Sequence, residues 1–74
     1  MGQYLDLIEH ERTLARASQE RAELARAASR EAAFYDTAEE LARQAAEEHH
    51  RARAHIEAAW RYQRLAVEHR EIAG

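Results

Sequence analysis

The sequence predicts an all-α fold, an antiparallel hairpin of two long helices at about residues 3–34 and 37–73. Three observations support this prediction. Alanine, with 18 copies, combines with Glu, Arg, Leu and Gln to give high helix propensity throughout, and the chain has no proline and only two glycines, Gly2 and Gly74. No segment shows the alternating β-branched residues of a strand. Small residues recur with helical spacing in each half, and the two patterns face different directions.

The first predicted helix carries a narrow seam of small residues at alternating steps of three and four. Its members are Ala15, Ser18, Ala22, Ala25, Ser29 and Ala32. Residues at these steps form one stripe along a helix, so this stripe is expected to pack against a second helix. Asp6 and Glu9 form a possible capping pair near the start, although the helix can begin as early as Gln3.

A turn is predicted where the first seam breaks, near residues 34–37. Continuing that seam along a straight helix would reach the polar positions Asp36, Arg43, His50 and Glu57. The same segment holds a capping box, Thr37 with Glu40. Asp36 with Glu39 offers a second capping box one residue earlier. No glycine or proline marks the turn. The alternative is one continuous or kinked coiled coil.

The second predicted helix repeats alanine at every seventh residue. These residues are Ala38, Ala45, Ala52, Ala59, Ala66 and Ala73. Small residues at this spacing let two helix backbones approach closely, so the two arms are expected to pack as an alanine-rich coiled coil.

Large apolar residues concentrate at the open end of the predicted hairpin, around more of the helix circumference than one neighbouring helix can cover. We therefore predict self-association, most simply a homodimer that forms a four-helix bundle. The expected interface residues are Tyr4, Leu7, Ile8, Ile56, Trp60, Tyr62, Leu65, Val67 and Ile72.

Composition restricts the classes of function. A chain of 74 residues is expected to form one domain, residues 1–74. The net charge of -3 disfavours general binding to nucleic acids or anionic membranes, and no apolar run approaches membrane-spanning length. Without cysteine there is no disulfide or thiol nucleophile, and no Gly-rich phosphate loop is present. We expect a soluble, cytoplasmic, non-enzymatic interaction or regulatory module that presents a helical surface to a protein partner and needs no cofactor.

One alternative is a metal-binding bundle. Glu47 and His50 have the Glu-x-x-His spacing and resemble the di-iron carboxylate pattern, in which further glutamates come from the other helix. Glu20 or Glu23 lies at a suitable level, and the metal would be iron or manganese, with metal-dependent oxidase chemistry possible. Glu47 and His50, however, fall on the most polar face of the second helix, whereas a buried metal centre needs inward ligands.

A line of residues beside the alanine seam offers a further interpretation. Glu48, His55, Tyr62 and His69 are spaced by sevens, so they are expected to be partly buried and to hydrogen-bond across the bundle, where they would set its register. The histidines could also form a pH-responsive element. The second alternative function is an RNA-binding hairpin dimer, which would require the arginines to be free on one basic face.

Overall fold

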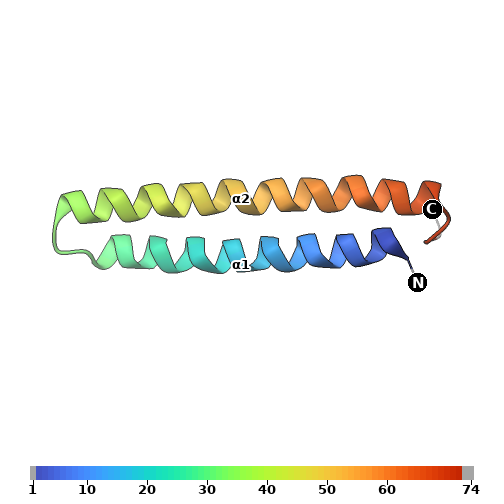
Figure 1. Cartoon of the computed structure of the whole chain (residues 1–74). Coiled ribbons are helices and arrows are strands. Elements are labelled where there is room, and N and C mark those ends of the chain that lie inside the picture. Colours follow the sequence, from blue (N-terminus) through green and yellow to red (C-terminus); the bar gives the residue numbers. More distant parts are fainter. Residues whose placement is uncertain (1, 73–74) are drawn as a thin grey trace.

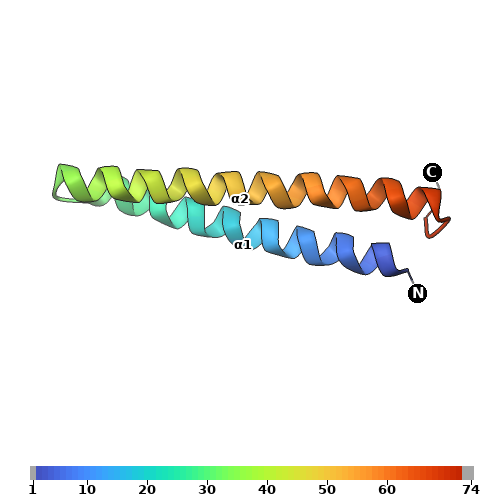
Figure 2. The ribbon, with the colours of Figure 1, turned by 45° about the horizontal axis from the view of Figure 1, so that its top comes forward.

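The computed structural model describes residues 2–72, which form two antiparallel helices, α1 (Gln3–Glu31) and α2 (Tyr35–Glu68). Figure 1 shows the helices side by side along their whole length, with the start of α1 and the end of α2 at the same end. In Figure 2, α1 is inclined to α2. The rod measures 54 × 15 × 15 Å. The predicted all-α helical hairpin is confirmed.

The core of the hairpin comes mainly from the predicted small-residue seams, whose members nearer the turn, Ala25, Ser29, Ala32 and Ala38, are half-buried. The buried residues are Ile8, Ala15, Ser18, Ala22, Ala45, Ala52, Ala59 and Ala66. Ala73, which continues the predicted repeat, lies outside the described residues. Because most of these side chains are no larger than a methyl or hydroxymethyl group, the two helices can pack closely. Larger groups join the core at the open end, where Tyr4, Tyr62 and Ile72 pack against Ile8, Ala59 and Ala66.

The turn lies at residues 32–34, a few residues before the position that the capping boxes predicted. Because α2 begins at Tyr35, Asp36 and Thr37 fall inside its first turn, and the N-cap residue Phe34 makes no side-chain capping bond. The Ser29 hydroxyl instead donates a hydrogen bond to the Ala38 carbonyl oxygen across the turn, at 2.6 Å. A capping bond contributes only about 1 kcal/mol, so packing of the seam can outweigh it.

Backbone angles explain why this turn needs no glycine. Ala32 has φ -65° and ψ 134°, and Phe34 has φ -115° and ψ 138°, so the chain turns through extended conformations open to any residue. Within residues 2–72, Arg70 is the only non-glycine residue with a positive φ. The sequence therefore lacked the glycine signal because the turn does not use a left-handed residue.

The second helix ends at Glu68, earlier than the predicted residue 73. Arg70 adopts φ 60°, its N–H donates to the Val67 carbonyl oxygen at 3.0 Å, and the Glu71 N–H donates to the Ala66 carbonyl oxygen at 2.8 Å. This pair of bonds is a Schellman motif with arginine in the left-handed position that glycine usually takes. The motif folds the chain back towards α1, which allows Ile72 to pack on the core.

Candidate functional site

Two residues of the predicted polar line form hydrogen bonds with α1. The Nε of Arg21 donates to Glu48 Oε2 at 2.7 Å, and Arg51 of α2 pairs with the other oxygen of the same carboxylate. His55 Nδ1 lies 2.5 Å from Glu11 Oε2. The predicted hydrogen bonding between the helices is therefore confirmed for Glu48 and His55.

The Glu48 carboxylate lies between arginines of both helices. Its side chain is only 12% exposed, although both arginines around it are largely exposed. The hydrogen bond from Arg21 is the main reason that the pKa of Glu48 lies below its ordinary value of 4.5, and Arg51 lowers it further. Glu48 thus acts as a charged link between the helices near the middle of the rod.

The line ends in aromatic contacts at the open end. The ring centroid of Tyr4 in α1 lies 6.5 Å from that of Tyr62 and 5.1 Å from that of His69. Both pairs are tilted, and their separations fall in the range of favourable aromatic contacts. Tyr4 therefore packs between two successive members of the α2 line.

A contact that the sequence did not suggest links the two ends of the described chain. The Glu71 Oε1 atom accepts hydrogen bonds from the backbone N–H groups of Tyr4 at 2.9 Å and Leu5 at 3.1 Å. Gly2, the N-cap of α1, has no side chain to cap this helix, so a residue 67 positions away from Tyr4 provides the cap. The only sequence signal was a helix start without its own capping side chain.

Two hollows lie on opposite sides of the alanine seam, and we call these two sides its flanks. One hollow, of about 280 Å³, is lined by Arg21, Ala25, Gln44, Glu47, Glu48 and Arg51. The other, of about 350 Å³, is lined by Gln19, Ala22, Glu23, Arg26 and His49. Residues two apart in a helix point about 200° apart, so the pairs Gln19 with Arg21 and His49 with Arg51 mark opposite sides. Steps of seven residues extend each flank towards the open end.

The first side is named the leucine flank. Its members are Leu7, Leu14, Arg21 and Ala28 of α1 and Gln44, Arg51, Ala58 and Leu65 of α2. In the half nearest the open end every one of these positions is apolar and half-buried. Charged members occur only in the half nearest the turn, where Arg21 and Arg51 both pair with Glu48.

The second side is named the tryptophan flank. Its members are Leu5, Arg12, Gln19 and Arg26 of α1 and His49, Ile56 and Gln63 of α2, with Arg16, Arg53 and Trp60 on its outer edge. Trp60 is 63% exposed and lines an apolar hollow of about 230 Å³ with Arg53, Ile56 and Glu57. This flank therefore combines an exposed aromatic ring with several arginines.

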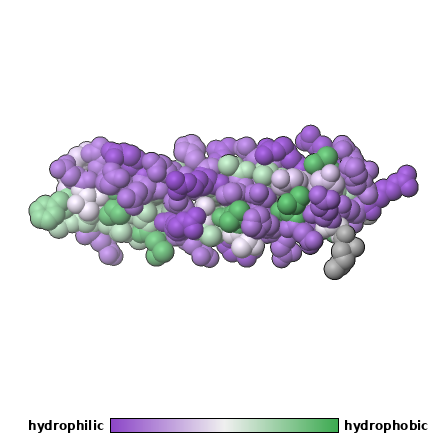
Figure 3. Space-filling view, in the orientation of Figure 1, coloured by the Kyte–Doolittle hydropathy of each residue, from purple (hydrophilic) through white to green (hydrophobic). Residues whose placement is uncertain are grey.

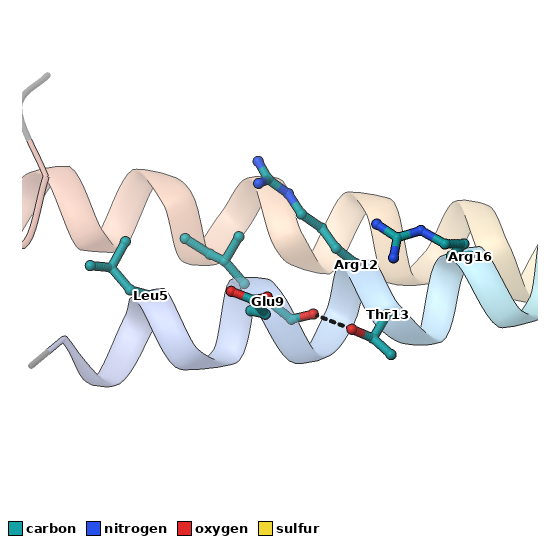
Figure 4. A pocket seen from close by; sticks show the side chains of 6 residues that line it. Leu5, Glu9, Arg12, Thr13 and Arg16 are labelled. Atoms are coloured by element: carbon teal, nitrogen blue, oxygen red, sulfur yellow. Dashed lines mark hydrogen bonds between the residues drawn. The ribbon is translucent and has the colours of Figure 1, made fainter.

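Arginines of the tryptophan flank lie close together along α1. Figure 4 shows Arg12 and Arg16 extending in the same direction beside a hollow of about 420 Å³, in which the Thr13 hydroxyl donates to the Glu9 carbonyl oxygen. Within residues 2–72, Arg12, Arg16, Arg26 and Arg53 form no ion pair. These arginines are therefore exposed without a close ion pair in this part of the chain, although Glu9 lines the same hollow as Arg12 and Arg16, and Glu57 lines the same hollow as Arg53.

The predicted interface residues differ in burial within one chain. Ile8 is buried, and Trp60 and Val67 are exposed. The others, which are half-buried, are Tyr4, Leu7, Ile56, Tyr62, Leu65 and Ile72. Exposed apolar residues also occur at Leu24 and at the turn, as Phe34 and Tyr35. In Figure 3, hydrophobic side chains gather at the turn end and recur as separate patches along α1.

The candidate metal ligands do not come together within one hairpin. Glu20, Glu23, Glu47 and His50 are all exposed. Glu47 lines the hollow on the leucine flank and Glu23 lines the hollow on the opposite flank. Across residues 2–72, no group of three His, Asp or Glu side chains is placed to hold a metal ion. A shared site would need ligands from a second chain.

Comparisons add no family assignment. The chain matches no protein-family model, and searches for similar curated proteins and solved structures gave no significant match. Neither helix in the described part of the chain is long and apolar enough to cross a membrane. Fold and contacts together place the chain in the class of antiparallel helical hairpins closed by an alanine seam.

Proposed function

We propose that this protein is a non-catalytic interaction or regulatory module that self-associates at the open end of the hairpin and presents a helical surface to a protein partner. The observation that carries the proposal is the large surface of the isolated chain. Its accessible area is 5768 Å², whereas a compact monomer of 8.6 kDa exposes about 4,700 Å². The excess of about 1,000 Å² is similar to the roughly 800 Å² that each partner buries in a stable complex.

The composition of the core supports the same proposal. Seven of the eight buried residues are alanine or serine, while the larger Leu7, Leu14 and Leu65 are only half-buried. A fully buried large apolar side chain contributes about 1.5–3 kcal/mol, and a single methyl group contributes much less. Placing these larger side chains in an interface would add the burial that the hairpin lacks by itself.

Light scattering coupled to size-exclusion chromatography, over a range of micromolar concentrations, tests self-association. We expect a dimer mass that falls on dilution, and a folded monomer at every concentration would contradict the proposal. Native mass spectrometry of protein purified without chelator reports subunit number and bound metal together. About one or more iron or manganese ions per chain would favour the metal-binding bundle instead.

A second candidate, RNA binding, is supported by the free arginines of the tryptophan flank. Arg12, Arg16 and Arg26 lie on one side of α1 without ion pairs inside the described chain. Glu9 and Glu23 lie on the same side and oppose the approach of phosphate. Filter binding to a paired RNA loop at low salt, with a steep loss of affinity as salt rises, is the result that would favour this candidate.

A further inference from the structure

We infer that the second copy of the chain docks on the leucine flank, so that the tryptophan flank stays on the outside of the dimer. This inference rests on the proposed self-association and specifies which side of the hairpin forms the interface. It narrows the predicted interface to the residues around Leu7, Leu14, Ala58 and Leu65, and assigns Ile56, Trp60 and Val67 to the outer surface.

The pattern of apolar residues favours the leucine flank. In four-helix bundles, each helix carries apolar residues at three positions of every seven. Two of these positions lie in the seam with the neighbouring helix, and the third lies on the flank that faces the rest of the bundle. In the open half of this hairpin, the leucine flank supplies that third position on both helices, as Leu7 and Leu14 in α1 and as Ala58 and Leu65 in α2. The corresponding positions of the tryptophan flank include Arg12 in α1 and Gln63 in α2.

Charge separates the two flanks further. Arg21 and Arg51 on the leucine flank both bind the Glu48 carboxylate, so their charge is partly compensated within the chain. Arg12, Arg16 and Arg53 on the other flank have no such partner inside the described residues. A two-fold interface brings the same surface of both chains together, so pairing the tryptophan flanks would bury these unpaired arginines together with the exposed Glu9 and Glu23 of the same side, at a cost in desolvation.

The polar line lies next to the leucine flank. Glu48 lines the hollow on that side with Arg21 and Arg51, and His55 and Tyr62 follow it at steps of seven. Docking of a second copy there would cover the Glu11–His55 pair of each chain. Buried polar pairs of this kind fix register and partner choice in helical bundles. The polar line would therefore set the register of the dimer at the leucine flank.

Cysteine cross-linking tests the inference directly, because the chain contains no cysteine. One set of variants places cysteine on the leucine flank at Leu14, Ala58 or Leu65, one residue per variant. A matched set on the other flank uses Gln19, Ile56 or Gln63. Each variant is first checked for helix content and dimer mass, and is then treated with a short bismaleimide at micromolar concentration. Ala58→Cys is the mildest change, and keeps the test valid if a leucine variant fails to fold.

We expect covalent dimers from the leucine-flank set on the order of a hundredfold faster than from the matched set, because cysteines held together in a dimer have millimolar effective concentration. Faster cross-linking of the matched set, or no cross-linking of either set in a dimeric protein, would overturn the inference and leave self-association intact. If the wild-type protein is monomeric at every concentration tested, the proposed self-association itself is contradicted.

The single tryptophan provides an independent readout. Iodide quenching of Trp60 fluorescence is measured in the dimer and again after dilution to the monomer. The inference predicts equal quenching constants in both states, because the ring remains on the outer surface. Protection of Trp60 in the dimer would show that the tryptophan flank forms the interface.

Discussion

The Glu71 carboxylate accepts a hydrogen bond from the backbone N–H of Tyr4 at 2.9 Å, and so caps the N-terminus of the first helix from the far end of the chain. A carboxylate at this position satisfies N–H groups that have no partner inside the helix, and it interacts favourably with the helix dipole. The Schellman motif at Arg70 is what brings Glu71 to this position. Residues 69–72 therefore fasten the open end instead of extending the second helix.

Glu71→Ala should destabilise the hairpin by about 1 kcal/mol, the usual effect of losing a capping side chain. Urea unfolding followed by circular dichroism, at one protein concentration, measures this change. Glu57→Ala serves as the control, since Glu57 is an exposed carboxylate in the middle of α2 with no ion pair among residues 2–72. Equal effects of the two substitutions would contradict the capping role.

Gly2→Ala provides a second test of the same contact. A Cβ atom at Gly2 would overlap the Glu71 carboxylate, which would have to move away from the Tyr4 and Leu5 N–H groups. The double variant Gly2→Ala/Glu71→Ala should therefore be little less stable than either single variant. Full additivity would mean that the glycine and the cap act independently.

The Glu11–His55 pair should contribute about 1 kcal/mol of coupling between the helices, as expected for a half-buried hydrogen bond to a carboxylate. A double-mutant cycle with Glu11→Ala, His55→Ala and the double variant isolates this energy from other effects of each change. Glu9→Ala combined with His55→Ala is the control, because Glu9 is exposed on the tryptophan flank. A coupling energy near zero would mean that the pair does not hold the helices together.

Glu48 should make the hairpin sensitive to acid. Its hydrogen bond with Arg21 lowers its pKa in the folded chain, so its ionisation stabilises the fold above the ordinary value of 4.5. As the pH falls below 4.5, this stabilisation begins to decrease, and it is lost once the pH has passed through the lower pKa that Glu48 has in the folded chain. Between about pH 5 and pH 3 the wild type should therefore lose more stability than Glu48→Gln. Glu47→Gln, an exposed neighbour, should follow the wild type.

The main features of this fold could be predicted because they depend on local and periodic signals. Helix propensity identified the helices, and the seven-residue repeat of alanine identified the side of α2 that faces α1, from Ala45 to Ala66. The same spacing placed Glu48 and His55 beside the seam, where they contact Arg21 and Glu11.

The errors occurred where tertiary contacts override local signals. Thr37 and Glu40 have the spacing of a capping box, but α2 begins at Tyr35, so this pair does not cap the helix. A capping bond is worth only about 1 kcal/mol, which packing of the seam can outweigh. The end of α2 was placed too late because Arg70 adopts a left-handed conformation that a non-glycine sequence does not suggest. The Glu71 cap depends on a contact between the two ends of the hairpin, which no local pattern can show.

Trp60→Ala should change the free energy of unfolding of the hairpin by less than about 1 kcal/mol, as expected for a largely exposed side chain. If Trp60 were packed in the core of a bundle, as the sequence suggested, the loss would be about 3–5 kcal/mol. Urea unfolding followed by circular dichroism, repeated at several protein concentrations, distinguishes the two cases. A large loss that grows with concentration would place the ring in the subunit interface.

Ala52→Leu tests how closely the helices approach along the seam. Ala52 is 1% exposed at the middle of α2, so three additional carbon atoms must displace α1 or adopt strained rotamers, at a cost of about 1–3 kcal/mol. Ala54→Leu is the matched control because Ala54 is exposed on the same helix, where leucine and alanine have similar helix propensity, and it should stay within about 0.5 kcal/mol of the wild type. Urea unfolding of both variants at one concentration measures the difference. If Ala52→Leu were as stable as Ala54→Leu, the seam would have room for leucine, and small side chains would not be what holds the two helices at their present separation.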